Sequence, residues 1–271
     1  MNGFYIYCII SEDGPQKFNV RGIDNKSKVF VLEYKDLGAV VSTINLSDFG
    51  ESELKKKLDD LKWTKRTVLN HQRVINKVMD GRTVIPMRFG IVYKKKEQIE
   101  TVLKKNYRKF RSILESLANK KEWGVKVFCD QSRLISKIQA NDSAIKKLRE
   151  QLKTSPEGNK FFLQKKIDAI IESRTEEETN KYSKIFLERL SKDSDEYVLN
   201  DTSPKELTGR NEEMILNAAY LVADKDLVGF EKNLDGLRKR YSEDRFLLEL
   251  SGPWPPYNFV NLEHDRPKQA N

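Results

Sequence analysis

Apolar and polar residues follow two different rhythms along the first 120 positions of the chain. From Glu51 to Met79 apolar residues recur every three or four positions, which predicts one amphipathic helix, and a second helix is expected at about 96–117. An extended segment at 83–93 separates the two helices. Three earlier runs are rich in β-branched and aromatic residues and predict strands at 4–10, 28–34 and 38–44. This order of elements indicates an α+β domain.

The first expected helix carries a histidine on its apolar face. The apolar positions include Leu58, Leu61, Val68 and Ile75, and His71 falls in step with the last two. A histidine in such a place is more often buried and hydrogen-bonded than catalytic, because the surrounding face packs against a core. We therefore expect His71 to be a core residue.

A second set of elements follows position 120. A strand is predicted at 123–129, and a long helical hairpin at about 132–190, broken by proline and glycine within 154–159. The pattern then predicts two strands, a helix and a last strand, at 197–199, 214–222, 226–241 and 246–250. Both sets suit a modified ferredoxin-like arrangement, in which helices cover one face of a mostly antiparallel sheet.

The predicted fold class is thus α+β, with two modified ferredoxin-like domains. The expected domains are 1–120 and 121–261, the second carrying the helical hairpin, and the polar tail at 262–271 is expected to be disordered. Within the hairpin, 172–181 is almost wholly polar, which predicts that it projects into solvent. This stretch is either a contact surface or simply a solvated helix.

Net positive charge is concentrated in one part of the chain. Of 271 residues, 34% are charged and the formal net charge is +9. Positions 51–130 hold 21 lysines and arginines against 10 acidic residues, whereas the remainder is close to neutral. The two helices within 51–117 could hold phosphates, which makes nucleic-acid binding the alternative function. Solvation of two amphipathic helices explains the same charge, and neither an RNA-binding sheet nor a DNA-recognition helix is evident.

Residues that carry chemistry are sparse. The sequence has no glycine-rich phosphate loop and no nucleophile elbow, and His264 lies in the polar tail without a ligand pattern around it. Cys8 and Cys129 fall in predicted strands, so we expect them to be small buried apolar groups. We therefore expect no catalytic residue, metal site or cofactor.

The apolar run at 4–10 is the longest in the chain and bears on where the protein resides. It is far shorter than the roughly 18 residues that span a bilayer. It also lacks the basic flank and cleavage site of a secretory signal. We expect no membrane segment and a cytoplasmic protein.

Several segments together resemble one protein family. TVIPMRFGIVY at 83–93 and NAAYLV at 217–222, followed by LSGPWPPYNFV at 250–260, resemble signatures of the GvpF/GvpL family of gas vesicle proteins. GAVVS at 38–42, HQRV at 71–74 and WGVKVF at 123–128 fit the same family. The resemblance extends from Phe4 to Val260 and leaves the hairpin at 131–192 as the part with little family sequence.

The resemblance implies a non-enzymatic accessory protein of gas vesicle assembly. Such proteins are expected to bind the hydrophobic GvpA-type shell protein or other accessory proteins, to limit shell-protein aggregation during nucleation, and to remain as a minor vesicle component. The expected location is the gas vesicle and the cytoplasm. The family fold, two modified ferredoxin-like domains with extra helices, agrees with the order of elements.

The family signatures also supply the candidate interaction residues. A partner could cover the apolar shell subunit by helix contact or by adding a strand. Rigid prolines and large rings make good anchors, but the rings could equally close the second domain's core after its last strand. Phe89 is expected to pack against the first sheet, and Arg88 to pair with a carboxylate. The candidates are Arg88, Phe89, Trp254, Pro255, Pro256 and Tyr257.

Overall fold

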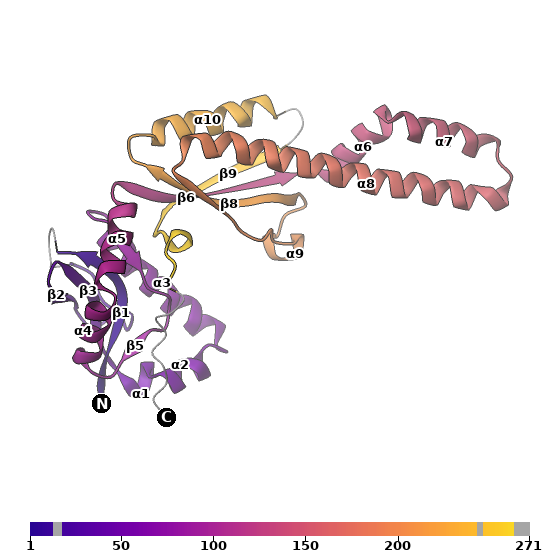
Figure 1. The fold of residues 1–271 in the computed structure, drawn as a ribbon. Coiled ribbons are helices and arrows are strands. Elements are labelled where there is room, and N and C mark those ends of the chain that lie inside the picture. Colours follow the sequence, from indigo (N-terminus) through magenta and orange to yellow (C-terminus); the bar gives the residue numbers. More distant parts are fainter. Residues whose placement is uncertain (13–17, 243–245, 263–271) are drawn as a thin grey trace. The chain divides into compact units, whose positions relative to one another are not determined.

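Two compact units make up the chain in the computed structural model, which describes residues 1–12, 18–242 and 246–262 (Figure 1). The first unit contains residues 1–122 and the chain from Pro253 onward, and the second contains 123–252. The chain leaves the first unit within strand β6 (Lys120–Cys129) and returns to it within β9 (Phe246–Trp254). The segment at 253–261, which the pattern assigned to the second domain, therefore packs with the first unit.

A five-stranded antiparallel sheet forms the centre of the first unit. Strand order is β2-β3-β1-β4, and β5 also pairs with β1. The strands expected at 4–10, 28–34 and 38–44 are confirmed, each within two residues at either end. The strands are β1 (Asn2–Ser11), β2 (Val29–Tyr34), β3 (Leu37–Asn45), β4 (Val84–Pro86) and β5 (Val92–Tyr93).

Helices cover both faces of this sheet, where the ferredoxin-like expectation had them on one. Helix α3 (Leu61–Met79) packs Val74, Ile75 and Val78 on one face, whereas α4 (Lys96–Lys105) and α5 (Tyr107–Leu117) pack on the other. A bulge in β1 between Ile6 and Cys8 changes which side chains face each side. The unbroken apolar run in β1 reflects this burial on both sides, because a strand with one wet face alternates with polar residues.

The prediction of a single helix at 51–79 is wrong in detail. The structure has α1 (Leu46–Phe49) and α2 (Glu51–Lys57), and α3 begins afresh at Leu61. The Asp60 carboxylate caps α3, accepting hydrogen bonds from the backbone N–H groups of Lys62 and Trp63 at 3.0 and 3.1 Å. Within α3 the buried residues are Thr67, His71, Val74, Ile75 and Val78, whereas Leu61 and Val68, nearer its start, are exposed. The helix expected at 96–117 likewise divides at Asn106 into α4 and α5.

The second unit has a four-stranded sheet in the order β7-β8-β6-β9. One face, bearing Val125, Val127 and Tyr220, packs against α8 and α10. The elements after β6 are α6 (Gln131–Asn141), α7 (Ser143–Thr154), α8 (Glu157–Leu190), the short 3-10 turn η1 (Ser191–Asp193), β7 (Glu196–Leu199), α9 (Lys205–Thr208), β8 (Glu213–Ala223), α10 (Leu227–Arg240) and β9.

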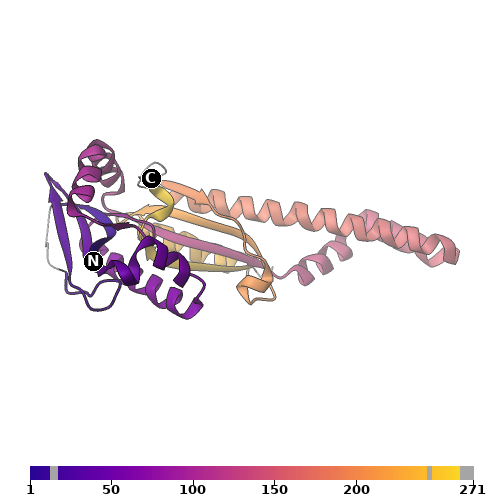
Figure 2. The ribbon, with the colours of Figure 1, turned by 90° about the horizontal axis from the view of Figure 1, so that it is seen from below.

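Helices α6, α7 and α8 form the predicted hairpin, which extends beyond the second sheet (Figures 1 and 2). The C-terminal part of α8 is anchored in the core by Phe186 and Leu190. The polar stretch at 172–181 does not simply project into solvent, because Thr175 is buried and Arg174 pairs with Asp142 at the start of α7. Polar side chains here face neighbouring helices, which a purely apolar criterion does not detect.

Other expectations concern isolated residues. Cys8 and Cys129 are free and fully buried, as expected. Leu262, taken as the start of the tail, packs partly buried against the first unit's core, whereas 263–271, with His264, lie outside the described residues. No helix within the described ranges is long and apolar enough to cross a membrane.

Candidate functional site

His71 is the centre at which several family-like segments of the first unit meet. The ring is buried, and its Nδ1 lies 3.0 Å from the Tyr5 hydroxyl oxygen. Its Nε2 lies 3.2 Å from both the Met87 carbonyl oxygen and the Tyr257 hydroxyl oxygen. Phe89 stacks edge-on against the imidazole at 5.8 Å between ring centroids. Residues from α3, β1, the 84–93 segment and the chain end are thereby brought together.

The partners of His71 determine its tautomer. A carbonyl oxygen only accepts, so Nε2 carries the proton and donates toward Met87, while Nδ1 accepts from the Tyr5 hydroxyl. The backbone N–H of Gly90 in turn donates to the Tyr5 oxygen at 2.9 Å. Burial lowers the pKa of His71 from 6.5 to about 4, an effect that the Met87 hydrogen bond only partly opposes. The imidazole is neutral at pH 7 and acts as a structural link, as the sequence predicted.

The returning chain end is held by more than Tyr257. Pro255 and Pro256 are buried, and the 3-10 turn η2 (Tyr257–Phe259) follows them. The Glu122 carboxylate accepts hydrogen bonds from the Asn258 backbone N–H at 3.0 Å and from its side-chain amide at 2.7 Å. Burial raises the pKa of Glu122, and these two donors oppose that rise. Tyr257 thus packs in the core of the first unit, not of the second as the alternative interpretation had it.

The remaining family-signature residues differ in exposure. Phe89 is half-buried and packs against the sheet core, which agrees with its prediction. Arg88, between Met87 and Phe89, is exposed, and the expected ion pair with a carboxylate is not found within the described part of the chain. Trp254 is 43% exposed at the end of β9. The structure therefore separates Tyr257, Pro255, Pro256 and Phe89, which support the fold, from Arg88 and Trp254, which reach solvent.

An exposed apolar stripe runs along α3 beside this centre. Leu61, Val68 and Leu69 lie at helical spacings of seven and eight, so they share one face, and Leu58 is the residue that caps the end of α2. Leu61 is 81% exposed. Val68 is one helical turn from His71, so the stripe lies beside the buried, hydrogen-bonded His71. The sequence pattern included Leu58, Leu61 and Val68 and placed them in the core, but it did not single out Leu69. The Asp60 cap was the signal that a separate helix starts at Leu61.

Basic residues do not form one surface on the first unit. Those of α3, such as Lys62 and Arg66, belong to a helix on one side of the sheet. Those of α4 and α5, such as Lys104 and Lys109, belong to helices on the opposite side. A continuous groove that follows a nucleic-acid backbone is not built from positive charge divided in this way.

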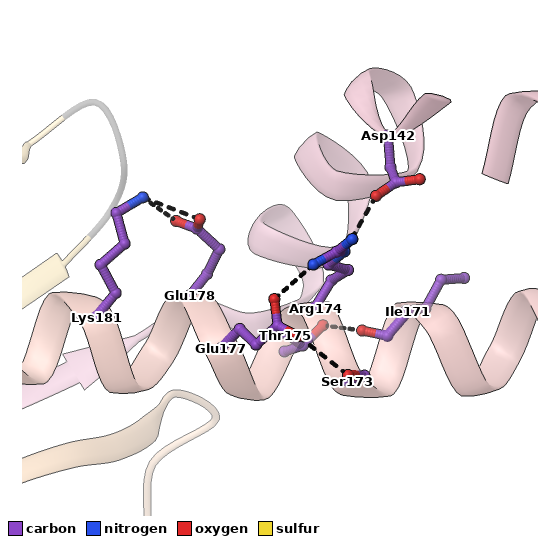
Figure 3. A network of polar contacts seen from close by, with 8 residues as sticks. All are labelled: Asp142, Ile171, Ser173, Arg174, Thr175, Glu177, Glu178 and Lys181. Atoms are coloured by element: carbon purple, nitrogen blue, oxygen red, sulfur yellow. Dashed lines mark hydrogen bonds and ion pairs between the residues drawn. The ribbon is translucent and has the colours of Figure 1, made fainter. Parts of the chain in front are cut away.

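A cleft in the second unit, between α6 and α8, has a volume of about 390 Å³, and Figure 3 shows polar contacts of the residues beside it. Arg174 donates to Asp142 at 3.3 Å and to Glu177 at 2.7 Å, and Lys181 pairs with Glu178 at 3.0 Å. Hydrogen bonds from the backbone N–H groups of Ile145 and Ala144, and then the charge of Arg174, lower the pKa of Asp142, while the hydrogen bond from Arg174 lowers the pKa of Glu177. These charged groups therefore pair with one another beside the cleft.

Metal-ligating side chains are dispersed in the described residues: nowhere in 1–12, 18–242 or 246–262 do three His, Cys, Asp or Glu side chains gather as a cation site. The candidate functional feature of the first unit is an exposed apolar surface. It consists of the α2–α3 apolar stripe, Leu58, Leu61, Val68 and Leu69, together with the neighbouring signature segments.

Comparison with known proteins agrees with the full-length resemblance. Residues 3–261 match the family model described as gas vesicle synthesis protein GvpL/GvpF. The chain is 26% identical over 266 residues to gas vesicle protein L1 of Halobacterium salinarum, covering 96% of this chain and 90% of the relative. It is 24% identical to gas vesicle protein F of a Nostoc species, covering 96% of this chain and 99% of that one.

Two crystal structures share the fold. The gas vesicle protein GvpF from an Anabaena species has a TM-score of 0.79 at 21% identity, covering 97% of this chain and all of that one. GvpF from Microcystis aeruginosa has a TM-score of 0.68 at 21% identity, covering 96% and 99%. The family match and the fold extend through both units, so this chain belongs to the GvpL/GvpF family of gas vesicle synthesis proteins.

Proposed function

We propose that this protein is a non-enzymatic accessory factor of gas vesicle assembly that binds the hydrophobic GvpA-type shell protein through the α2–α3 apolar stripe. The observation that carries the proposal is the exposure of Leu58, at the end of α2, and of Leu61, Val68 and Leu69 in the first half of α3. Contiguous exposed apolar side chains on a folded protein commonly mark a binding surface. The family to which the chain belongs supplies the biological context.

The stripe is suited to an aggregation-prone client. An apolar subunit loses unfavourable contact with water when it covers these side chains. Lys62, Lys65 and Arg66 lie among the exposed positions of the same helix and keep the complex charged and soluble. A client held in this way is prevented from aggregating until it is transferred to a growing vesicle. This role places the protein at the gas vesicle and in the cytoplasm during assembly, as a minor component that also contacts other accessory proteins.

Two signature residues extend this surface in the proposal. Arg88 and Trp254 are exposed, while the neighbouring Met87 and Tyr257 contact His71 on α3. Trp254 supplies a rigid ring, and Arg88 a guanidinium that can donate to a client's carboxylate or carbonyl groups. Pro255, Pro256, Tyr257 and Phe89 act indirectly by fixing the positions of these two side chains.

Replacing the exposed tryptophan tests this division of roles. We expect Trp254→Ala to weaken co-purification of the shell protein ~10-fold, because large rings dominate binding energies at interfaces. Its free energy of unfolding should fall by no more than about 1 kcal/mol, since the ring is already 43% exposed. Pull-down and urea unfolding measure the two effects. Loss of stability without loss of binding would assign Trp254 to the fold alone.

Placing negative charges on the α2–α3 apolar stripe tests whether it is the surface that binds the shell protein. We expect Leu61→Glu combined with Leu69→Glu to abolish shell-protein binding and to leave the protein folded, since both positions are exposed. The matched control is Leu207→Glu with Val228→Glu, two exposed apolar residues of the second unit. Equal binding by both double variants would reject the α2–α3 stripe as the client site.

Salt separates this proposal from nucleic-acid binding by the basic helices. Apolar burial survives added salt, whereas phosphate contacts weaken steeply as counterions compete. Binding of the shell protein should therefore change little between low and high salt. Strong salt-sensitive retention on nucleic acid, with none of the shell protein retained, would favour the alternative.

We infer that both units derive from a modified ferredoxin-like plan, an inference supported by their strand orders. Numbered within each unit, both sheets run 2-3-1-4. In the second unit the elements follow strand, helices, strand, strand, helix, strand, with α6–α8 in the first helical position and α10 in the second. The hairpin then extends an existing helical connection of that plan.

A further inference from the structure

The face of α8 that points away from α7 combines exposed rings with charges of both signs. Ile167 and Thr175 are buried and mark the inner face of the helix. Phe161 and Phe162, 61% and 65% exposed, lie on the outer side because a helix advances about 100° per residue. The exposed outer positions, spaced by three and four, are Phe161, Phe162, Lys165, Ala169, Glu172 and Glu176.

Charges on the two faces of α8 differ in how they are satisfied. On the inner face, Arg174 pairs with Asp142 and Glu177, and Lys181 pairs with Glu178 (Figure 3). On the outer face, Lys165 makes only a cation–π contact, with its Nζ 4.9 Å from the centroid of the Phe161 ring. Neither Lys165 nor Glu172 has an ion-pair partner in the described portion of the chain. The outer face therefore carries an unused pair of opposite charges.

These opposite charges cannot meet within one helix. Lys165 and Glu172 are seven residues apart, or ~10 Å along the axis at 1.5 Å per residue. Two antiparallel copies of α8, related by a two-fold axis close to Ala169, bring each lysine level with the other copy's glutamate. The methyl side chain of Ala169 permits close approach at the crossing point. The outer face is thus complementary to itself, as a two-fold interface requires.

The length of the hairpin suits this pairing. Ala169 lies twelve residues from Glu157, where α8 begins, and thirteen residues from Tyr182, which packs against the second unit's core. In an antiparallel pair centred near Ala169, Glu157 at the tip of one hairpin therefore lies about level with Tyr182 of the other copy, where α8 enters the core of the second unit. The Phe161 and Phe162 rings then cover the aliphatic stems of Glu172 and Glu176 on the other copy.

We propose that the occupant of this face is a second copy of the chain, and that the protein self-associates through antiparallel α8 helices. The proposal is independent of shell-protein binding, because the α2–α3 stripe belongs to the other unit. The self-complementary charge pattern identifies the partner: an unrelated partner would have no reason to match Lys165 and Glu172 about one point.

Sedimentation velocity over a range of concentrations tests the association. We expect wild-type protein to form dimers and Phe161→Ala with Phe162→Ala to raise the dimer dissociation constant ~10-fold or more. Leu207→Ala with Val228→Ala is the matched control and should behave as wild type. Monomers at every concentration in wild-type protein, or equal weakening in both double variants, would overturn the proposal.

A charge exchange tests the predicted register. Lys165→Glu should weaken dimers by placing two like charges together, and adding Glu172→Lys should restore them, because the two-fold axis pairs these positions twice. Circular dichroism checks that each variant remains helical. Failure of the double exchange to restore association would contradict antiparallel pairing about Ala169.

A thiol at the axis gives a geometric test. Cys8 and Cys129 are buried, so Ala169→Cys introduces the accessible thiol. Mild oxidation should link two copies, since a two-fold axis brings the paired Cα atoms within the span of a disulfide. Lys146→Cys on α7, also exposed, is the control. Equal cross-linking at both positions would indicate random collision and overturn the proposed interface.

Discussion

Acidification from pH 7 to pH 4 is expected to lower the free energy of unfolding of the first unit by about 3 kcal/mol through His71 alone. The pKa of this imidazole falls from 6.5 in the unfolded chain to about 4 in the fold. The folded state therefore favours the neutral ring. Its stabilising contribution is complete above pH 6.5, decreases as the pH falls toward 4, and levels off below the folded pKa.

Hydrogen exchange of the α3 amides, measured at several pH values, reports this loss within the first unit. His71→Gln is the control, because it keeps a polar side chain but cannot titrate. The variant should be less stable at pH 7 and show a shallower pH dependence between 6.5 and 4. Parallel pH profiles for the two proteins would contradict the assignment of His71 as a neutral buried link.

Removal of the Tyr257 ring is expected to destabilise the first unit by about 2–3 kcal/mol. The ring packs against the core that contains α3, and its hydroxyl lies 3.2 Å from His71 Nε2. Tyr257→Ala loses both the packing and the hydrogen bond. Tyr257→Phe loses only the hydrogen bond and should cost about 1 kcal/mol, because Met87 still accepts from His71.

Urea unfolding of these variants beside Trp254→Ala makes the comparison direct. The two aromatic residues are three positions apart in one signature, yet Tyr257 should dominate stability and Trp254 should dominate client binding. A Tyr257→Ala protein as stable as wild type, with shell-protein binding lost, would reverse these roles.

Strand positions in the first unit were predictable because β-branched and aromatic runs report a buried sheet directly. The burial of His71 was predictable for a similar reason, since it lies in step with Ile75 on an apolar face. The family signatures identified Phe89 and Tyr257 as important. Pattern alone did not show that these residues converge, because Tyr257 is 186 positions from His71 in the chain.

The errors share a physical origin in polar groups. Asp60 caps α3 with its carboxylate, so α2 and α3 are separate helices where one was predicted. Arg174 pairs with Asp142 at the start of α7, so this stretch of α8 contacts a neighbouring helix. Hydropathy counts such side chains as solvated. Capping and ion-pair patterns, weighed together with apolar periodicity, would have corrected both predictions.

The return of the chain to the first unit has a consequence for biosynthesis. The ribosome completes all strands and helices of the first sheet long before it adds Tyr257 and Asn258. Until then His71 lacks its tyrosine partner from the chain end, and the Glu122 carboxylate lacks both donors from Asn258. Tyr257 and Asn258, which emerge after the whole of the second unit, thus close the first unit, and nascent chains stalled after Gly252 should be sensitive to protease in α3 while released chains resist it.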